Sequence, residues 1–130
     1  MVGTCGSLRG TATRLRELNP AVRVIAAEPS TSAVMSGGQP GAHRIEGTGT
    51  GRIVPMFDPS LVQGVEAVST EDAEAMARRL AREEAIFAGT STGANVVAAL
   101  RIAAALGPDA TVLAIACDTG LKYVSTPLFA

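Results

Sequence analysis

The sequence predicts an α/β protein in three layers, with a parallel sheet covered by helices on both faces. Segments with helical periodicity alternate with short apolar segments, and these short segments are continuous apolar runs rather than alternating ones. Continuous apolar runs are typical of strands that are buried on both faces, which occur in parallel sheets. We find no internal repeat, and 130 residues correspond to one domain of ordinary size.

The amino-acid composition argues against several classes of function. Hydrophobic residues make up 47% of the chain and charged residues 18%, as in folded globular proteins. Eleven Lys and Arg stand against twelve Asp and Glu, so no basic excess favours nucleic acid as a partner. No apolar run is long enough to span a membrane. The first residues lack the pattern of a secretory signal, so we expect a reducing, cytoplasmic location.

The first helix is expected over residues 8–18, because apolar side chains recur there on one face. These side chains are Leu8, Ala12, Leu15 and Leu18. Asn19-Pro20 ends the helix, since the residue before a proline avoids the helical conformation. A β-branched run over 22–27 then predicts a buried strand.

A long loop is expected over residues 30–55, which are rich in Gly, Pro, Ser and Thr and show no clear periodicity. Loops of this length in small domains usually carry function. Residues 61–68 predict a second strand.

Ser69 is expected to begin the next helix as part of a capping box, with the acidic Asp72 three positions later. Five apolar residues of this helix share one face: Ala73, Met76, Ala77, Leu80 and Ala81. The pattern is completed by a short strand over 86–88, a buried helix over 95–106 and a buried strand over 111–116.

Three loops of small residues are candidates for ligand binding. Residues 3–7 run directly into the first helix, 89–95 lead into the last helix, and Asp118-Thr119-Gly120 follows the last strand. Backbone N–H groups at a helix N-terminus bind phosphate, helped by the helix dipole. Each loop also has a plainer interpretation, as a tight turn, an N-cap or an Asx turn. Because parallel sheets gather such loops at one edge, their convergence favours a phosphate-ligand site.

Other kinds of chemistry find less support. A Walker loop needs a lysine and a dinucleotide fingerprint needs Gly in place of Cys5, so a nucleotide-binding domain is a weaker alternative. One His and two distant Cys do not suggest a metal site, and no catalytic triad or carboxylate pair can be assembled. We expect His43 in a surface loop, Cys5 as a small packing residue, and Glu46 and Arg52 facing solvent.

Four motifs follow one another between Val2 and Phe129: GTCGS from Gly3, SGGQPGAHRIEG from Ser36, ARRLAREEAIFAGTSTGAN from Ala77, and DTGLKYVSTPLF from Asp118. Their order and content resemble the cysteine synthases. These are O-acetylserine sulfhydrylases of fold type II that depend on pyridoxal 5′-phosphate (PLP), and they are related to cystathionine β-synthase. The resemblance implies PLP as cofactor and a β-replacement, in which O-acetylserine or a similar activated serine reacts with sulfide to give cysteine. It also implies a homodimer, with the tail of serine acetyltransferase as a further partner.

The resemblance assigns roles to particular positions. Five residues match the loop that holds the PLP phosphate: Gly3, Thr4, Cys5, Gly6 and Ser7. Thr119 matches the hydroxyl residue that forms a hydrogen bond with the pyridine nitrogen, and residues 89–95 match a loop that lines the cofactor cleft. Cys5 stands where a glycine is common, and a left-handed conformation would strain a cysteine there.

Residues 47–51 match the glycine loop that closes over substrate in the cysteine synthases. The candidate residues of this substrate and closure loop are Gly47, Thr48, Gly49 and the adjacent Arg52. Thr48 and Arg52 stand where many cysteine synthases carry apolar or aromatic residues. Since Arg matches the geometry of phosphate, an enzyme that uses O-phosphoserine is one alternative, and a cystathionine β-synthase-like enzyme is another.

The only lysine, Lys122, lies in the last motif, whereas the resemblance places the Schiff-base lysine upstream of the phosphate loop. We therefore expect residues 1–130 to be the C-terminal part of a longer enzyme, inactive alone and without a catalytic residue of its own. An uncovered sheet edge then predicts oligomerisation, exchange of elements or a complementing chain. The alternative from another class is a non-catalytic module that binds a phosphorylated ligand or a protein partner.

Overall fold

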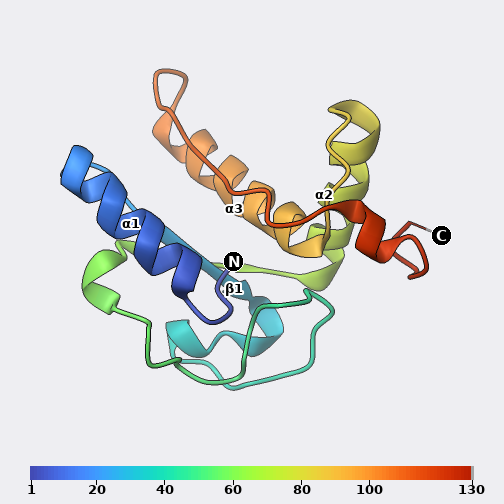
Figure 1. Cartoon of the computed structure of the whole chain (residues 1–130), viewed down its shortest axis with the longest axis horizontal. Coiled ribbons are helices and arrows are strands. Elements are labelled where there is room, and N and C mark those ends of the chain that lie inside the picture. Colours follow the sequence, from blue (N-terminus) through green and yellow to red (C-terminus); the bar gives the residue numbers. More distant parts are fainter. Residues whose placement is uncertain (130) are drawn as a thin grey trace.

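The structure, a computed structural model, describes residues 1–129 and confirms the predicted α/β class (Figure 1). Within these residues the helices are α1 (Gly6–Leu18), α2 (Thr70–Glu83) and α3 (Thr90–Leu106), and the strands are β1 (Ile25–Pro29) and β2 (Gly64–Val68). Short 3₁₀ turns cover Ser30–Ser32, Val34–Ser36, Pro59–Leu61 and Gly120–Tyr123. Helix α2 begins directly after its predicted cap Ser69, whereas α1 begins two residues and α3 five residues earlier than periodicity predicts, because their first turns consist mainly of small residues.

The two strands form a parallel pair, as predicted, with Ile25 opposite Gly64 and Pro29 opposite Val68. Beside them, the N–H of Val2 donates to the carbonyl of Ala27 at 2.9 Å. Through this hydrogen bond the first residues of the chain lie beside β1 before they enter α1. Adjacent residues of a strand point to opposite faces, so Ala26 and Ala27 face different sides of the strand pair.

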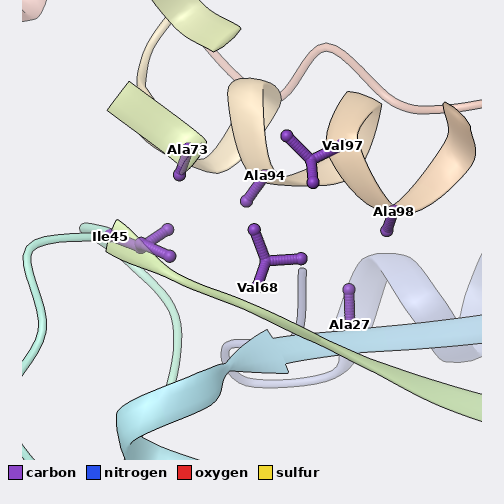
Figure 2. Packing of buried hydrophobic residues seen from close by; sticks show 7 residues of the cluster. All are labelled: Ala27, Ile45, Val68, Ala73, Ala94, Val97 and Ala98. Atoms are coloured by element: carbon purple, nitrogen blue, oxygen red, sulfur yellow. The ribbon is translucent and has the colours of Figure 1, made fainter. Parts of the chain in front are cut away.

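Both faces of the strand pair are covered. On one face, Ala27 and Val68 pack against α3 and α2 (Figure 2). On the other face, Ala26 packs in a cluster with Val2 and Cys5, which Leu8 of α1 also contacts. Helices on both faces of a parallel sheet agree with the predicted layers.

Ile45 anchors the long loop of residues 30–55 in the core. Its side chain is fully buried and lies in the cluster with Val68, Ala73 and Ala94 (Figure 2). Ile45 thus ties a loop that contains no helix longer than a 3₁₀ turn and no strand to β2, α2 and α3. This contact places the following residues, 46–52, next to the first residues of the chain.

The predicted cap of α2 is present, but only half of the capping box forms. Ser69 Oγ accepts a hydrogen bond from the N–H of Asp72 at 3.0 Å. The carboxylate of Asp72 does not return to Ser69, because it accepts from Arg101 of α3 at 3.0 Å. The acidic residue of the motif therefore links two helices.

Replacing the capping hydroxyl is expected to destabilise the protein moderately. Ser69→Ala should lower the free energy of unfolding by about 1 kcal/mol, because the N–H of Asp72 loses its partner. Ser69→Asn, which retains a capping oxygen, should lose only a few tenths of that amount. Urea denaturation followed by circular dichroism measures both variants, and equal losses would contradict a capping role.

Two predicted strands are absent from the described sheet. Residues 86–88 contribute only a single antiparallel bridge, between Ala88 and Thr119. Residues 111–116 belong to no strand, and Leu113 is 79% exposed. This segment runs back along α3 (Figure 1), with Asn95 Nδ2 donating to the carbonyl of Ile115 at 2.9 Å. The prediction of a buried strand there is wrong for residues 1–129, because no neighbouring strand receives its backbone hydrogen bonds.

The prediction that the last helix is buried holds only for its first half. Residues Thr90 to Ala94 and the side chains of Val97 and Ala98 are buried, whereas Leu100 and Leu106 are 52% and 48% exposed. An apolar helix is buried only where other elements reach it, and within the described residues α2 and the strands cover its N-terminal half. No helix among residues 1–129 has the length and apolar character needed to cross a membrane.

Candidate functional site

The loop Gly3–Ser7 presents unpaired backbone donors at the start of α1. Cys5 is the N-cap residue, and its side chain makes no capping hydrogen bond. Within residues 1–129, the N–H groups of Gly6, Ser7 and Leu8 donate no hydrogen bond, as expected for the first turn of a helix. Thr4, Gly6 and Ser7 are exposed. Exposed donors at the positive end of a helix dipole suit an anionic ligand.

Cys5 turns the chain into the helix and packs below the loop. Its φ of +75° lies in the left-handed region, as anticipated for a position where a glycine is common. Its side chain is buried against Val2 and Ala26, as expected for a packing residue. Burial raises the pKa of the Cys5 thiol, with the charge of Arg9 acting in the opposite direction. The thiol therefore stays protonated at neutral pH, so it does not act as a nucleophile.

The glycine loop lies directly against the phosphate-loop segment. The N–H of Gly49 donates to the carbonyl of Val2 at 3.0 Å. A Cβ placed on Gly3 would lie 2.2 Å from the carbonyl oxygen of Gly47. Gly47 and Gly49 have φ values of +72° and +56°, and Gly51 has +71°, which glycine adopts without strain. The fold thus brings together two loops separated by about forty residues in the sequence.

His43 has a structural role that the sequence analysis missed. Its Nε2 lies 3.1 Å from the carbonyl of Gly49, and its Nδ1 accepts from the N–H of Ile45 at 3.3 Å. A ring that accepts at Nδ1 and faces a carbonyl at Nε2 carries its proton on Nε2. His43 therefore connects the buried Ile45 to the glycine loop. The nearby Arg52 is exposed, as expected, and forms no ion pair within the described part of the chain.

Thr119 lies on a loop that is held in place by hydrogen bonds to the carboxylate of Asp118. Asp118 Oδ1 accepts from the N–H of Gly89 at 3.2 Å, and Oδ2 accepts from the hydroxyl of Tyr123 at 2.6 Å. Burial, followed by the hydrogen bond to Asp118, raises the pKa of Tyr123, so the phenol remains a donor. Thr119 Oγ1 accepts from the N–H of Leu121 at 3.3 Å and is exposed, which leaves the hydroxyl proton available for a ligand. Sequence motifs alone did not reveal this arrangement of Asp118, Tyr123 and Gly89.

The N-terminal half of α3 connects the loops. The main-chain nitrogen of Met1, two residues before the loop Gly3–Ser7, donates to Asn95 Oδ1. Thr92 Oγ1 accepts from the N–H of Cys117 at 2.9 Å, just before Asp118 and Thr119. Thr90 Oγ1 donates to the carbonyl of Arg44, close to the glycine loop, at 3.5 Å. Polar side chains on consecutive turns of one helix therefore hold the three regions together.

A cleft of about 560 Å³ is lined by His43, Arg44 and Glu46, by Glu74 and Thr90, and by Tyr123 and residues 126–128. Glu46 directly precedes the glycine loop and Thr90 begins α3, whereas no residue of 3–7, 47–51 or 118–120 lines the cleft. Among residues 1–129, no three His, Cys, Asp or Glu side chains lie close enough together to hold a metal ion. The polar part of the cleft lining consists of hydroxyl and charged side chains.

Comparison with known proteins identifies similar chains. The family model described as "Pyridoxal-phosphate dependent enzyme" matches residues 1–118. A probable cysteine synthase of Bacillus subtilis is 43% identical over 127 residues, which make up 98% of this chain and 41% of that protein. The chain therefore spans about two fifths of the length of the curated relatives that it matches.

Solved structures show the same relationship. The chain superposes on O-acetylserine sulfhydrylase isoform 3 of Entamoeba histolytica with a TM-score of 0.95 and 35% identity, covering 98% of this chain and 38% of that one. For the O-acetylserine dependent cystathionine β-synthase of Helicobacter pylori, the TM-score is 0.92 with 37% identity, over 99% of this chain and 42% of that one.

Proposed function

This chain belongs to the family of pyridoxal-phosphate dependent enzymes, and we propose that it provides the phosphate-binding and ring-binding side of a cysteine synthase-like active site. Two observations together carry the proposal. The N–H groups at the start of α1 donate no hydrogen bond within residues 1–129, and the hydroxyl proton of Thr119 is available for a ligand. Both groups are connected to α3, through Asn95 and Thr92. The resemblance to the cysteine synthases agrees with the relatives found.

The residues present fit PLP. The exposed N–H groups of Gly6 and Ser7 suit the dianionic phosphate, and backbone donation does not depend on the Cys5 side chain. The Thr119 hydroxyl is neutral and accepts from the N–H of Leu121, so its proton is free to form a hydrogen bond with an unprotonated pyridine nitrogen. When bound, PLP supplies an electron sink that permits a leaving group to depart from the β-carbon of an amino acid. A neutral partner at the ring nitrogen makes this sink weaker than a carboxylate partner would.

We propose β-replacement as the reaction of the complete enzyme, with O-acetylserine and sulfide as substrates and cysteine as product. The cysteine synthases among the relatives support this proposal. Glu46, Thr90 and Tyr123 line a cleft that begins at the residue before the glycine loop, and we propose that they face the substrate. The glycine loop, attached through Gly49 to Val2 and His43, would exclude water above the cofactor.

A second candidate donor substrate is O-phosphoserine. Arg52 follows the glycine loop, is exposed and forms no ion pair within residues 1–129. A free guanidinium at this place suits a phosphate leaving group better than an acetate ester. The similarity to the O-acetylserine dependent cystathionine β-synthase of Helicobacter pylori supports a cystathionine β-synthase-like reaction as a further alternative.

The lysine that binds the cofactor covalently is proposed to lie outside residues 1–130. Lys122 is exposed in the 3₁₀ turn Gly120–Tyr123, which belongs to neither the phosphate loop nor the glycine loop. A homodimer, a serine acetyltransferase tail as partner and a cytoplasmic location likewise remain proposals.

Titration of the 130-residue chain with PLP tests the phosphate site. PLP is expected to bind at least about tenfold more tightly than pyridoxal, which lacks the phosphate, because the loop donors act on that group. Isothermal calorimetry measures both affinities, and ADP serves as the control for a nucleotide site. Borohydride reduction followed by peptide mass spectrometry should find no stoichiometric label on Lys122.

Equal affinities for PLP and pyridoxal would contradict the phosphate site, and stoichiometric labelling of Lys122 would contradict the proposed place of the lysine. An activity assay of the complete polypeptide distinguishes the catalytic hypothesis from the hypothesis of a non-catalytic binding module. The complete polypeptide should produce cysteine from sulfide and one of the two activated serines, whereas a binding module produces none.

A further inference from the structure

Ser32 carries a buried hydroxyl that the proposed function does not use. The residue is 1% exposed and lies in the 3₁₀ turn that follows β1. Within residues 1–129, its Oγ has no hydrogen-bond partner, in contrast to the other buried side-chain oxygen and nitrogen atoms. Buried polar groups in folded proteins are paired with protein or with ordered water, because an unpaired one is costly. Ser32 therefore requires a partner that the surrounding side chains do not supply.

Glu28, at the end of β1, is also buried, with 1% exposure. Its Oε1 accepts from the N–H of Ser36 at 2.9 Å and from the hydroxyl of the same residue at 2.5 Å. Its Oε2 accepts only from the N–H of Met35, at 2.7 Å. Each carboxylate oxygen offers about two acceptor positions, so Oε2 has one unused.

Ser32 and Glu28 line the same small cavity, together with Gly3, Gly49, Thr50 and Arg52. The volume of this cavity is about 10 Å³. A space of about 10–15 Å³ with two to four polar partners holds one water molecule, whereas phosphate or an organic ligand needs far more room. The rest of its lining is mainly apolar and consists of Val2, Val34, Met35, Ile53, Val54 and Phe57.

We propose that this cavity binds one structural water, which accepts a hydrogen bond from Ser32 Oγ and donates one to Glu28 Oε2. Such a water satisfies the buried hydroxyl and uses the remaining acceptor position of the carboxylate. It also fills the space below Gly49 and Thr50, so it supports the glycine loop from the side of β1. This site is independent of PLP and goes beyond the proposed function.

A crystal structure of the chain at about 1.8 Å resolution, with two serine variants, tests the proposal. The electron density should show one ordered water within hydrogen-bond distance of Ser32 Oγ and Glu28 Oε2. Ser32→Ala should lose this water and lower the Tm by about 3–5 °C, because the hydrogen bond from the water to Glu28 Oε2 is lost and the cavity is left empty. Ser30→Ala is the matched control, since Ser30 lies in the same turn but is exposed, and it should shift the Tm by less than about 1 °C.

A dry cavity predicts the opposite behaviour of the variant. Removing a hydroxyl that has no partner leaves stability unchanged or raises it. An unchanged or higher Tm for Ser32→Ala, or a wild-type map without a peak at this position, therefore overturns the proposal. A peak with the short contacts of a metal cation also overturns it. If Ser32→Ala does not fold, the wild-type map decides.

Discussion

Gly93→Ala is expected to lower the free energy of unfolding by about 4 kcal/mol or more. A Cβ on Gly93 would lie 2.1 Å from the carbonyl oxygen of Ala73 and 2.9 Å from the backbone nitrogen of Ala77. Both atoms belong to the backbone of α2, so no side-chain rotation relieves the overlap. The two helices must separate, which opens the buried cluster that includes Ala73 and Ala94.

Gly10→Ala provides the matched control for Gly93→Ala. Gly10 is exposed on α1, and a Cβ there meets nothing within 4 Å. Since alanine favours a helix over glycine, this variant should gain about 0.5–1 kcal/mol. Urea denaturation measures both changes. If Gly93→Ala unfolds at the same urea concentration as the parent chain, the close contact between α2 and α3 is disproved.

Gly3→Ala is expected to weaken PLP binding by more than about tenfold. The added methyl group would lie 2.2 Å from the carbonyl oxygen of Gly47, where the phosphate loop meets the glycine loop. Because the obstacle is backbone, one of the two loops must move. A shift of the phosphate loop also moves the N–H donors of Gly6 and Ser7 away from the phosphate.

Gly6→Ala separates this steric effect from a general sensitivity of the loop. Gly6 is the first residue of α1, and a Cβ there meets nothing within 4 Å. Its backbone N–H is retained, so the affinity for PLP should stay within about threefold of the parent chain. Calorimetric titration of both variants, after circular dichroism has verified that they are folded, measures the difference. Equal affinities for the two variants would show that the phosphate loop does not depend on its contact with Gly47.

Much of the fold follows from short-range signals in the sequence. Ser69 begins α2 and Asn19 follows the last residue of α1, because caps and prolines act on their immediate neighbours. The apolar runs near β1 and β2 indicated buried parallel strands, since such strands need apolar residues on both faces. The loop Gly3–Ser7 was a candidate for phosphate binding because of its composition and its place before a helix, which are local features as well, and this role stays a prediction.

Other features depended on contacts between distant residues. The segment 111–116 has the composition of a buried strand, yet it remains unpaired and Leu113 is exposed. The exposed Leu100 shows the same limit, because an apolar pattern states what a segment can bury but not which element covers it. His43 appeared to be a surface residue until the fold placed Gly49 and Ile45 on the two nitrogens of its ring.

By itself, the sequence determined the α/β class, the caps of the helices and the loops that carry glycine and hydroxyl groups. Tertiary structure decided which loops meet: Gly3 against Gly47, Asp118 between Gly89 and Tyr123, and Ser32 beside Glu28. The physical reason is the range of the forces involved. Capping, turn formation and periodic burial act over a few residues. Gly3 and Gly47 lie 44 positions apart and Gly89 and Asp118 lie 29 apart, so these pairs are brought together only when the apolar faces of the strands and helices pack.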